Sequence, residues 1–415
     1  PRTQCQPGSS STARLTTVPN SDCAPKRPMS KRAANPVPLA LPEWPAVVAA
    51  QSPDEAARRL TAAIRAACDS LSFALSGICS ASPTGEADQY NQWIADGKHG
   101  SMAWLADQAE TKADARGELP SAKSILMVAD RYAPRGLSAS PQGPLDGTIA
   151  KYARGRDYHL TIKNRLHKLA DALRAHLQSS PPRFGALQPD GLPHEFRSFV
   201  DTAPIHERAY AQIAGLGWRG KHTLLIHPKQ GSYLLLGGML TTLDLVPAAT
   251  PPAIVPDHCG TCTRCIDACP TQAITPYSVD ARRCIAYLTI EHQRPIDPDL
   301  QASIGQWLYG CDICQDVCPH NSPRPADTMP AAPDELLPDY LSRRSAFNLL
   351  EVLGWDETAK RAAVEGTAMK WASLEMLKRN AAIVGRNILS DASKSQSLST
   401  EQRAALESAI TKQSS

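Results

Sequence analysis

The sequence lacks any long apolar run and any strong excess of one charge. No stretch of about eighteen apolar residues occurs in the 415-residue chain, so no segment is expected to cross a bilayer. Lysine and arginine number 44 and aspartate and glutamate 41, which leaves a net charge of +3. Because this balance is nearly even, composition does not point to a nucleic acid or a membrane as partner. We expect no membrane association.

A convincing export signal is also lacking, which predicts a reducing, cytoplasmic compartment. Residues 1–45 differ from the rest, being rich in Ser, Thr, Pro and Arg. A transit peptide has this composition, but the stretch shows no amphipathic apolar face. We therefore interpret residues 1–45 as a disordered leader.

Cysteine is not scarce, and eight of the twelve cysteines lie between residues 257 and 321. The first four follow the spacing C-x2-C-x2-C-x3-C-P, and the last three repeat the second half of it, again with a proline. In such paired motifs three thiolates surround one cubane cluster and the last cysteine reaches the other. The spacing therefore predicts two [4Fe-4S] clusters, one held by Cys259, Cys262, Cys265 and Cys318 and the other by Cys269, Cys284, Cys311 and Cys314.

Two other interpretations of the cysteines are weaker. A structural zinc site closes with four ligands and has no use for the trailing x3-C-P. Disulfides are disfavoured in a reducing compartment. Cys68 and Cys79 fall within apolar patterns, and we expect them to be small core residues.

Strands alternate with helices between residues 60 and 250, which predicts an α/β sandwich. An amphipathic helix from about residue 54 leads to a strand, residues 125–129 form another, and the loop 151–159 opens into a long helix. Residues 196–200 read as a buried strand, Pro204 as a helix start, and residues 223–226 and 232–236 as a strand pair. Short amphipathic helices in antiparallel pairs follow residue 335.

Asp201 is the titratable residue whose position is most suggestive, because it ends a predicted strand just before a helix. It could instead cap that helix or pair with Arg208. In an apolar, cofactor-filled cleft its pKa would rise, and it could act as a general acid near neutrality.

Two further segments carry polar groups. Asp157, Tyr158 and His159 stand at a helix start, where a cap and a solvated basic face are the alternative. The segment GLGWRGKH lets backbone N–H groups approach a bulky ligand, but it lacks the strand–turn–helix context of a dinucleotide site.

Several of these segments, in this order, resemble the epoxyqueuosine reductases. The similarity is carried by KYARGRDYH, VDTAPIHERAYAQIAGLGWRGKHTLLI, DHCGTCTRCIDACPTQAI, RRCIAYLTIEH, YGCDICQDVCPHN and GTAMKWASLEMLKRNAAIVGRN, and spans about residues 55–390. The resemblance implies an α/β corrinoid-binding sandwich, a ferredoxin-like two-[4Fe-4S] domain and a C-terminal α-helical, HEAT-like region. The corresponding ranges are 46–250, 251–332 and 333–415.

The resemblance also implies a cobalamin-dependent enzyme that removes the epoxide oxygen of epoxyqueuosine at the wobble position of tRNA, the last step of queuosine synthesis. Asp201 matches the proton donor of the family. The residues that we assign to cobalamin are Lys112, Arg116, Asp157, Tyr158, His159, Asp201, Lys221, His222 and Ile226. The cobalamin motif D-x-H-x-x-G is not satisfied, because Ile162 stands where its glycine would be.

Contacts with tRNA phosphates are assigned by resemblance to Lys370, Lys378, Arg379 and Asn380. The chain departs from the family at His320, where tryptophan is usual, and at Trp371, where a basic residue is expected. It also lacks an arginine before the L-P-x-A-K-S turn, so Lys112 or Arg116 must serve.

Two other classes of protein remain open. A corrinoid reductive dehalogenase shares the cluster motifs, but it would bring a twin-arginine export signal and no helical tail. A simple two-cluster electron carrier would leave most of the chain unexplained. We expect a monomeric enzyme that receives electrons from an unidentified donor.

Overall fold

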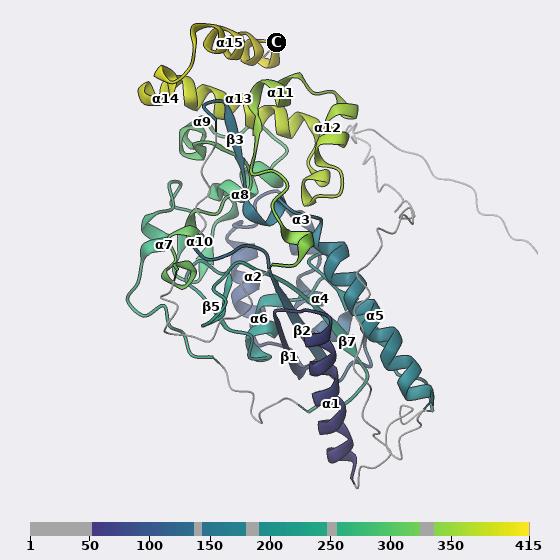
Figure 1. The fold of residues 1–415 in the computed structure, drawn as a ribbon. Coiled ribbons are helices and arrows are strands. Elements are labelled where there is room, and N and C mark those ends of the chain that lie inside the picture. Colours follow the sequence, from purple (N-terminus) through teal and green to yellow (C-terminus); the bar gives the residue numbers. More distant parts are fainter. Residues whose placement is uncertain (1–51, 137–142, 180–190, 247–254, 324–335, 415) are drawn as a thin grey trace, which may run out of the picture. The chain divides into compact units, whose positions relative to one another are not determined.

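The computed structural model describes residues 52–136, 143–179, 191–246, 255–323 and 336–414, and the expected leader 1–45 lies outside them. Helix α1 (Pro53–Ser70) begins after Ser52, whose side chain accepts a hydrogen bond from the Glu55 N–H. It leads into β1 (Leu75–Ser80), as predicted (Figure 1). Among the described residues, no helix is long and apolar enough to cross a membrane.

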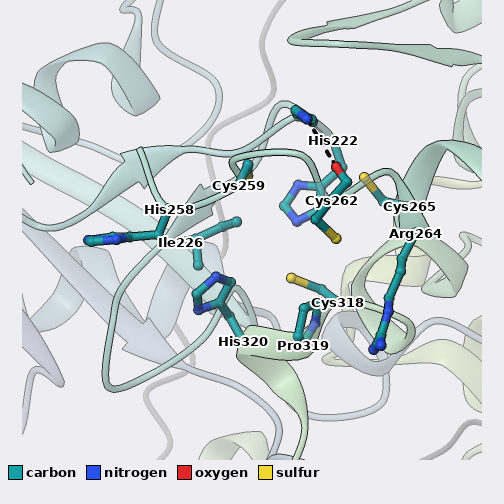
Figure 2. Close-up of a pocket in the computed structure, with 11 residues that line it drawn as sticks. His222, Ile226, His258, Cys259, Cys262, Arg264, Cys265, Cys318, Pro319 and His320 are labelled. Atoms are coloured by element: carbon teal, nitrogen blue, oxygen red, sulfur yellow. Dashed lines mark hydrogen bonds between the residues drawn. The ribbon is translucent and has the colours of Figure 1, made fainter. Parts of the chain in front are cut away.

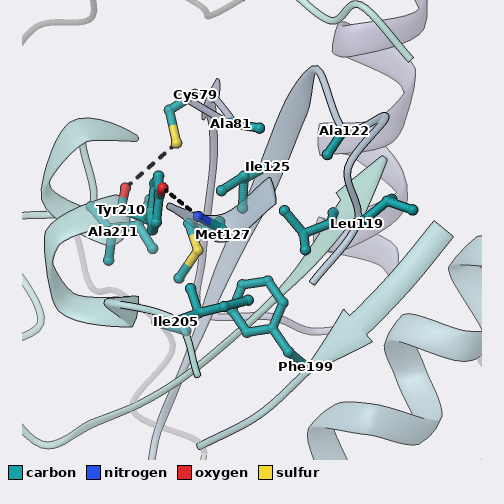
Figure 3. Close-up of a cluster of buried hydrophobic side chains, with 14 of the residues drawn as sticks. Cys79, Ala81, Leu119, Ala122, Ile125, Met127, Phe199, Ile205, Tyr210 and Ala211 are labelled. Atoms are coloured by element: carbon teal, nitrogen blue, oxygen red, sulfur yellow. Dashed lines mark hydrogen bonds between the residues drawn. The ribbon is translucent and has the colours of Figure 1, made fainter. Parts of the chain in front are cut away.

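Four strands form the main sheet in the order β1-β2-β7-β4, and all neighbours are antiparallel. Strand β2 (Ser124–Arg131) is buried along its whole length, because helices cover both faces of the sheet. Ile125 and Met127 pack against α6 (Glu207–Ile213), as Figure 3 shows. On the opposite face Arg165 of α5 (Tyr158–Ser179) pairs with Asp130. The other two strands are β4 (Phe196–Phe199) and β7 (Leu234–Thr241).

The strands predicted at residues 125–129 and 196–200 and the helix after the loop 151–159 are confirmed as β2, β4 and α5. The predicted pairing of residues 223–226 with 232–236 is wrong. Strand β7 is central and already has β2 and β4 as neighbours, so β6 (Leu225–Ile226) pairs with β5 (Trp218–Arg219) instead. The helix expected at Pro204 begins three residues later, at Glu207.

A second sheet joins the three predicted domains. Its order is β10-β3-β11, with β3 (Asp146–Ile149) parallel to β10 (Trp307–Tyr309) and antiparallel to β11 (Ala346–Asn348). Each strand comes from a different one of the ranges 46–250, 251–332 and 333–415. Backbone hydrogen bonds therefore fasten these ranges to one another.

The cysteine-rich region is built from short elements. The two short helices α7 (Arg264–Asp267) and α10 (Ile313–Asp316) contact each other, one from each cysteine motif. Between them lie β8 (Ile274–Thr275), β9 (Ser278–Val279), α8 (Ile285–Ile290) and α9 (Pro298–Gln301). Three further helices, α2 (Ala87–Ala95), α3 (Ala103–Asp107) and α4 (Ala109–Ala113), connect β1 to β2.

The C-terminal region is helical, as predicted. Helices α11 (Leu349–Gly354), α13 (Leu374–Ser390) and α15 (Thr400–Ser414) pack against one another. Ser373 caps α13, its hydroxyl accepting from the Met376 N–H. The remaining helices are α12 (Glu357–Val364) and α14 (Ala392–Gln396), and the 3-10 turn η9 (Ala368–Trp371) precedes α13.

Candidate active site and cluster sites

One pocket, with an empty volume of about 360 Å³, is lined by the four cysteines that the sequence assigns to the first cluster (Figure 2). Three of them lie on the loop around α7, and Cys318 follows α10. The structure thus brings the last cysteine of the second motif to the first three cysteines of the first motif.

The other four cysteines also gather. Cys284 and Cys311 pack against one hydrophobic core around Ile285 and Tyr287. Burial raises the pKa of Cys311, and the neighbouring Cys284 and Cys269 raise it further. Burial likewise raises the pKa of Cys314, with Cys311 and Cys284 again adding to the effect.

The donor set fits iron–sulfur clusters better than a single ion. Among the described residues, no group of three His, Cys, Asp or Glu side chains is arranged to hold a single metal ion. Burial raises the pKa of Cys318 to about 11. Such buried thiols stay protonated at neutral pH unless iron replaces their protons.

Two buried ring N–H groups support the same fit. His222 lines the pocket and is 3% exposed, and its Nδ1 accepts from the Leu224 N–H at 3.2 Å, which leaves the proton on Nε2. Trp218 packs against Cys318 and Cys259. In the described part of the chain His222 Nε2 has no hydrogen-bond partner, and the Trp218 N–H is directed to the Cys259 thiol, whose pKa it lowers. Cluster sulfurs would supply the missing acceptor.

Asp201 lies at the end of β4 and is contacted by two of the residues predicted beside it. The Tyr158 hydroxyl donates to its Oδ2 at 3.1 Å, and His159 Nε2 lies 3.2 Å from the same oxygen. His159 Nδ1 is 2.7 Å from Asp157 Oδ1, and Lys370 Nζ is 2.6 Å from Asp157 Oδ2. The Asp201 side chain remains 60% exposed. The carboxylate is thus held from one side and open on the other.

The pKa of Asp201 lies below its usual value in this structure, and the rise expected in a cofactor-filled cleft stays a prediction. Desolvation raises this pKa, but the hydrogen bond and charge of His159, with the Tyr158 hydroxyl and Lys112, lower it below the usual value. The pKa of its partner His159 is raised instead. Burial lowers the pKa of His159, but Asp157 and Asp201 together raise it to about 9. At neutral pH the proton therefore resides on His159.

Glu207 is a member of the site that sequence reasoning missed. Its Oε1 accepts from the Asp201 N–H at 2.6 Å. Burial, with the charge of Asp201, raises the pKa of Glu207 to about 8. This hydrogen bond holds Asp201 at a φ of +56°, in the left-handed region. Its signal in the sequence was its place in the first turn of the helix after Asp201, to which the sequence analysis gave no role.

The two alternative roles of Asp201 are not seen. The residue before α6 is His206, so Asp201 does not cap this helix. Arg208 directs its guanidinium to the carbonyl and hydroxyl of Thr223, at 2.9 and 3.2 Å.

The residues assigned to cobalamin fall into two groups. Lys112 lies near Asp201 and Glu207, whose charges partly offset the lowering of its pKa by burial. Arg116 is paired with Asp114 at the surface. Lys221 donates to the carbonyls of Gly260 and Cys262, and His222 and Ile226 line the pocket of the first cluster.

Two of the four residues assigned to tRNA make hydrogen bonds within the protein. Asn380 is 1% exposed, and its amide donates to the carbonyls of Thr289 and Leu308. Arg379 donates to three backbone carbonyls of the cluster region, those of Leu288, His292 and Arg294. Both side chains fasten α13 to that region. Lys378 is half-buried and has no acceptor in the part of the chain that the structure describes.

Known proteins match this chain over most of its length. A family model for a 4Fe-4S double cluster binding domain matches residues 258–321, and one described as "Epoxyqueuosine reductase QueG, DUF1730" matches residues 112–202. The epoxyqueuosine reductase of Xanthomonas campestris pv. campestris is 37% identical over 344 residues, which cover 81% of this chain and 88% of that protein. The chain belongs to the epoxyqueuosine reductase family.

Other family members agree. The epoxyqueuosine reductase of Synechococcus sp. is 39% identical over 295 residues, 70% of this chain and 82% of that protein. A structure of the enzyme from Streptococcus thermophilus has a TM-score of 0.63 at 25% identity, covering 84% of this chain and 88% of that one. An epoxyqueuosine reductase solved with an epoxyqueuosine-modified tRNA stem loop has a TM-score of 0.64 at 22% identity, covering 86% and 99%.

Several predictions from the sequence are thereby confirmed. The chain is an oxidoreductase of this family, with a double-cluster domain and a helical C-terminal region. The match to the double cluster binding domain confirms the prediction of two [4Fe-4S] clusters.

Proposed function

We propose that this chain reduces epoxyqueuosine to queuosine at the wobble position of a tRNA, using cobalamin and two [4Fe-4S] clusters. The observation that carries the proposal is the Asp201 carboxylate, which Tyr158 and His159 hold in place while 60% of its side chain stays open to a ligand. The family membership of the chain supports the substrate. We assign the reaction to the cytoplasm, a monomer and an external electron donor.

Cobalamin, when bound, supplies a cobalt centre to which the clusters pass electrons one at a time. We assign its binding to the two groups of residues around Asp201 and around the first cluster, with Arg116 the peripheral member. His159 does not fit a role as cobalt ligand, because both ring nitrogens already face carboxylates.

The chain's own residues handle the protons. Removing the epoxide oxygen as water consumes two protons, and Asp201 is the group open to the substrate. His159 and Glu207, with pKa values of about 9 and 8, are protonated at neutral pH and adjoin Asp201. Substrate that covers the exposed carboxylate desolvates it and raises its pKa, which favours transfer of a proton from His159 to Asp201.

Turnover is therefore expected to fall at alkaline pH. The single-turnover rate should begin to decline near pH 8, by about tenfold per unit between the two pKa values and about a hundredfold per unit above the higher one. In Glu207→Gln the component near pH 8 should vanish and the one near pH 9 remain, since His159 is unchanged. Stopped-flow rates in buffers of matched ionic strength measure both. A rate that is unchanged from pH 7 to pH 10 contradicts this role for His159 and Glu207.

His222→Phe is expected to lower the reduction potential of the first cluster. Its Nε2–H would stabilise the more negative, reduced cluster, and a charge-assisted hydrogen bond of about 1.4 kcal/mol corresponds to about 60 mV for one electron. A redox titration followed by electron paramagnetic resonance measures the shift. The second cluster serves as the internal control, and an unchanged first potential refutes the contact.

The proposed function is tested by anaerobic reconstitution with iron, sulfide and cobalamin, followed by reaction with tRNA bearing epoxyqueuosine. Loss of one oxygen from the nucleoside, measured by mass spectrometry and dependent on both cobalamin and reductant, is the expected result. Binding of cobalamin with no change in the nucleoside would overturn the proposal.

A further inference from the structure

Trp371 is the most exposed large hydrophobic side chain among the described residues, at 71%. The turn that presents it is nevertheless firmly anchored. Ala368 and Met369 of η9 and the following Ala372 are buried, and the Tyr309 hydroxyl donates to the Ala368 carbonyl at 3.3 Å. The ring therefore contributes little to the core, although its backbone is fixed by the core. A large apolar surface held out in this way is typical of a binding contact.

The indole lies next to the group that surrounds Asp201. Lys370 Nζ is 4.8 Å from the centroid of the Trp371 ring and 2.6 Å from Asp157 Oδ2. Asp157 in turn contacts His159, which contacts Asp201. Three contacting side chains thus separate the ring from the open carboxylate.

A second cation, Arg343, lies beside Gly366, which precedes η9 in the chain. Arg343 is exposed, and its guanidinium has no acceptor in the described part of the chain. Its backbone N–H donates to the Arg154 carbonyl, and its Nη1 lies 3.7 Å from where a Cβ on Gly366 would be. The Gly366 carbonyl accepts from the Asp157 N–H at 2.8 Å. Arg343 therefore lies beside Gly366, which bonds to Asp157 through its carbonyl, whereas Lys370 contacts Asp157 directly.

We propose that Trp371 stacks on a base of the substrate RNA next to the nucleotide that is reduced, and that Arg343 binds an adjacent phosphate. The inference rests on the proposed function and names the surface that receives the anticodon loop. Bases of single-stranded loops bind by stacking on aromatic rings, and cations beside the ring attract the backbone. Arg343 has no acceptor among the described residues, and the phosphates of an RNA would supply one. This favours an RNA over a protein as the partner.

The test is RNA binding by reconstituted holoenzyme without reductant, so that no turnover occurs. The probe is an anticodon stem-loop bearing epoxyqueuosine. Trp371→Ala should weaken binding roughly ten- to a hundredfold, and Trp371→Phe should restore most of it. Trp104→Ala, which removes another exposed tryptophan at 45%, is the matched control and should bind as wild type. Arg343→Gln should reduce the dependence of log Kd on log salt by about one phosphate contact.

Two further stem-loops, each with an abasic sugar on one side of epoxyqueuosine, locate the base. The wild-type enzyme should bind one of these abasic loops as weakly as Trp371→Ala binds the intact loop. With that abasic loop, Trp371→Ala should cause no further loss of affinity. The stacking is overturned if Trp371→Ala and wild type bind the intact loop with equal affinity. It is also overturned if Trp371→Ala weakens binding of both abasic loops as much as it weakens binding of the intact loop. Failure of the proposed function is seen separately, as wild type that binds the loop but does not reduce it when reductant is added.

Discussion

Asp201→Asn is expected to retain both clusters and bound cobalamin while its single-turnover rate falls by about 10² to 10⁴. Asparagine tolerates the left-handed φ of +56° nearly as well as aspartate, so the backbone should not move. Its amide oxygen can still accept from Tyr158, and its N–H can still donate to Glu207. The variant thus removes the acid while keeping its position, and it also lowers the pKa of His159 because the charge of Asp201 is gone.

The measurement is rapid-quench reduction of epoxyqueuosine in tRNA, with visible spectra and iron analysis of the same samples. Asp171→Asn is a matched control, because Asp171 is 75% exposed on α5 and pairs only with its neighbour Arg174. The control should react as wild type. An Asp201→Asn enzyme as fast as wild type would remove Asp201 from the mechanism, whereas lost cobalamin would make its role one of binding.

The parts of the fold that were predictable are those in which local sequence decides the structure. Strand β2 is a continuous apolar run, buried on both faces, and helix α5 follows a polar start and keeps its apolar period. The cysteines were predictable because cluster geometry constrains their spacing. In each case the residues that carry the signal are close together in the chain.

Features that depend on distant partners were not predictable. Strand β7 is hydrogen-bonded to β2 on one side and to β4 on the other. It therefore has no free edge for the local pairing expected within residues 223–236. In the sheet β10-β3-β11, strand β3 pairs with two strands that are each more than 150 residues away in the chain. No local sequence pattern predicts such pairing.

The site shows the same division. The position of Asp201 at a strand end could be read from the sequence, but the direction of its pKa depends on His159, 42 residues away. Arg379 and Asn380 look like RNA contacts in a helix, yet they bind carbonyls some 70 to 90 residues away in the cluster region. A basic or polar residue can serve either purpose, and burial distinguishes the two.

Removing cluster ligands is expected to have the other large effect, and it tests how the two motifs cross. Cys265→Ala and Cys318→Ala should each abolish the same paramagnetic signal and reduce iron by about half, because both residues line one pocket. Cys314→Ala should abolish the other signal. All three should lose turnover, since electrons must pass through both clusters to reach the substrate.

Cys79→Ala is the control: Cys79 is fully buried in the core beneath α6, so its loss costs some stability but no iron. If Cys318→Ala instead shared its lost signal with Cys314→Ala, each motif would bind its own cluster. Cys318 would then line the pocket without binding the first cluster. The order in which electrons pass between the clusters would have to be assigned again.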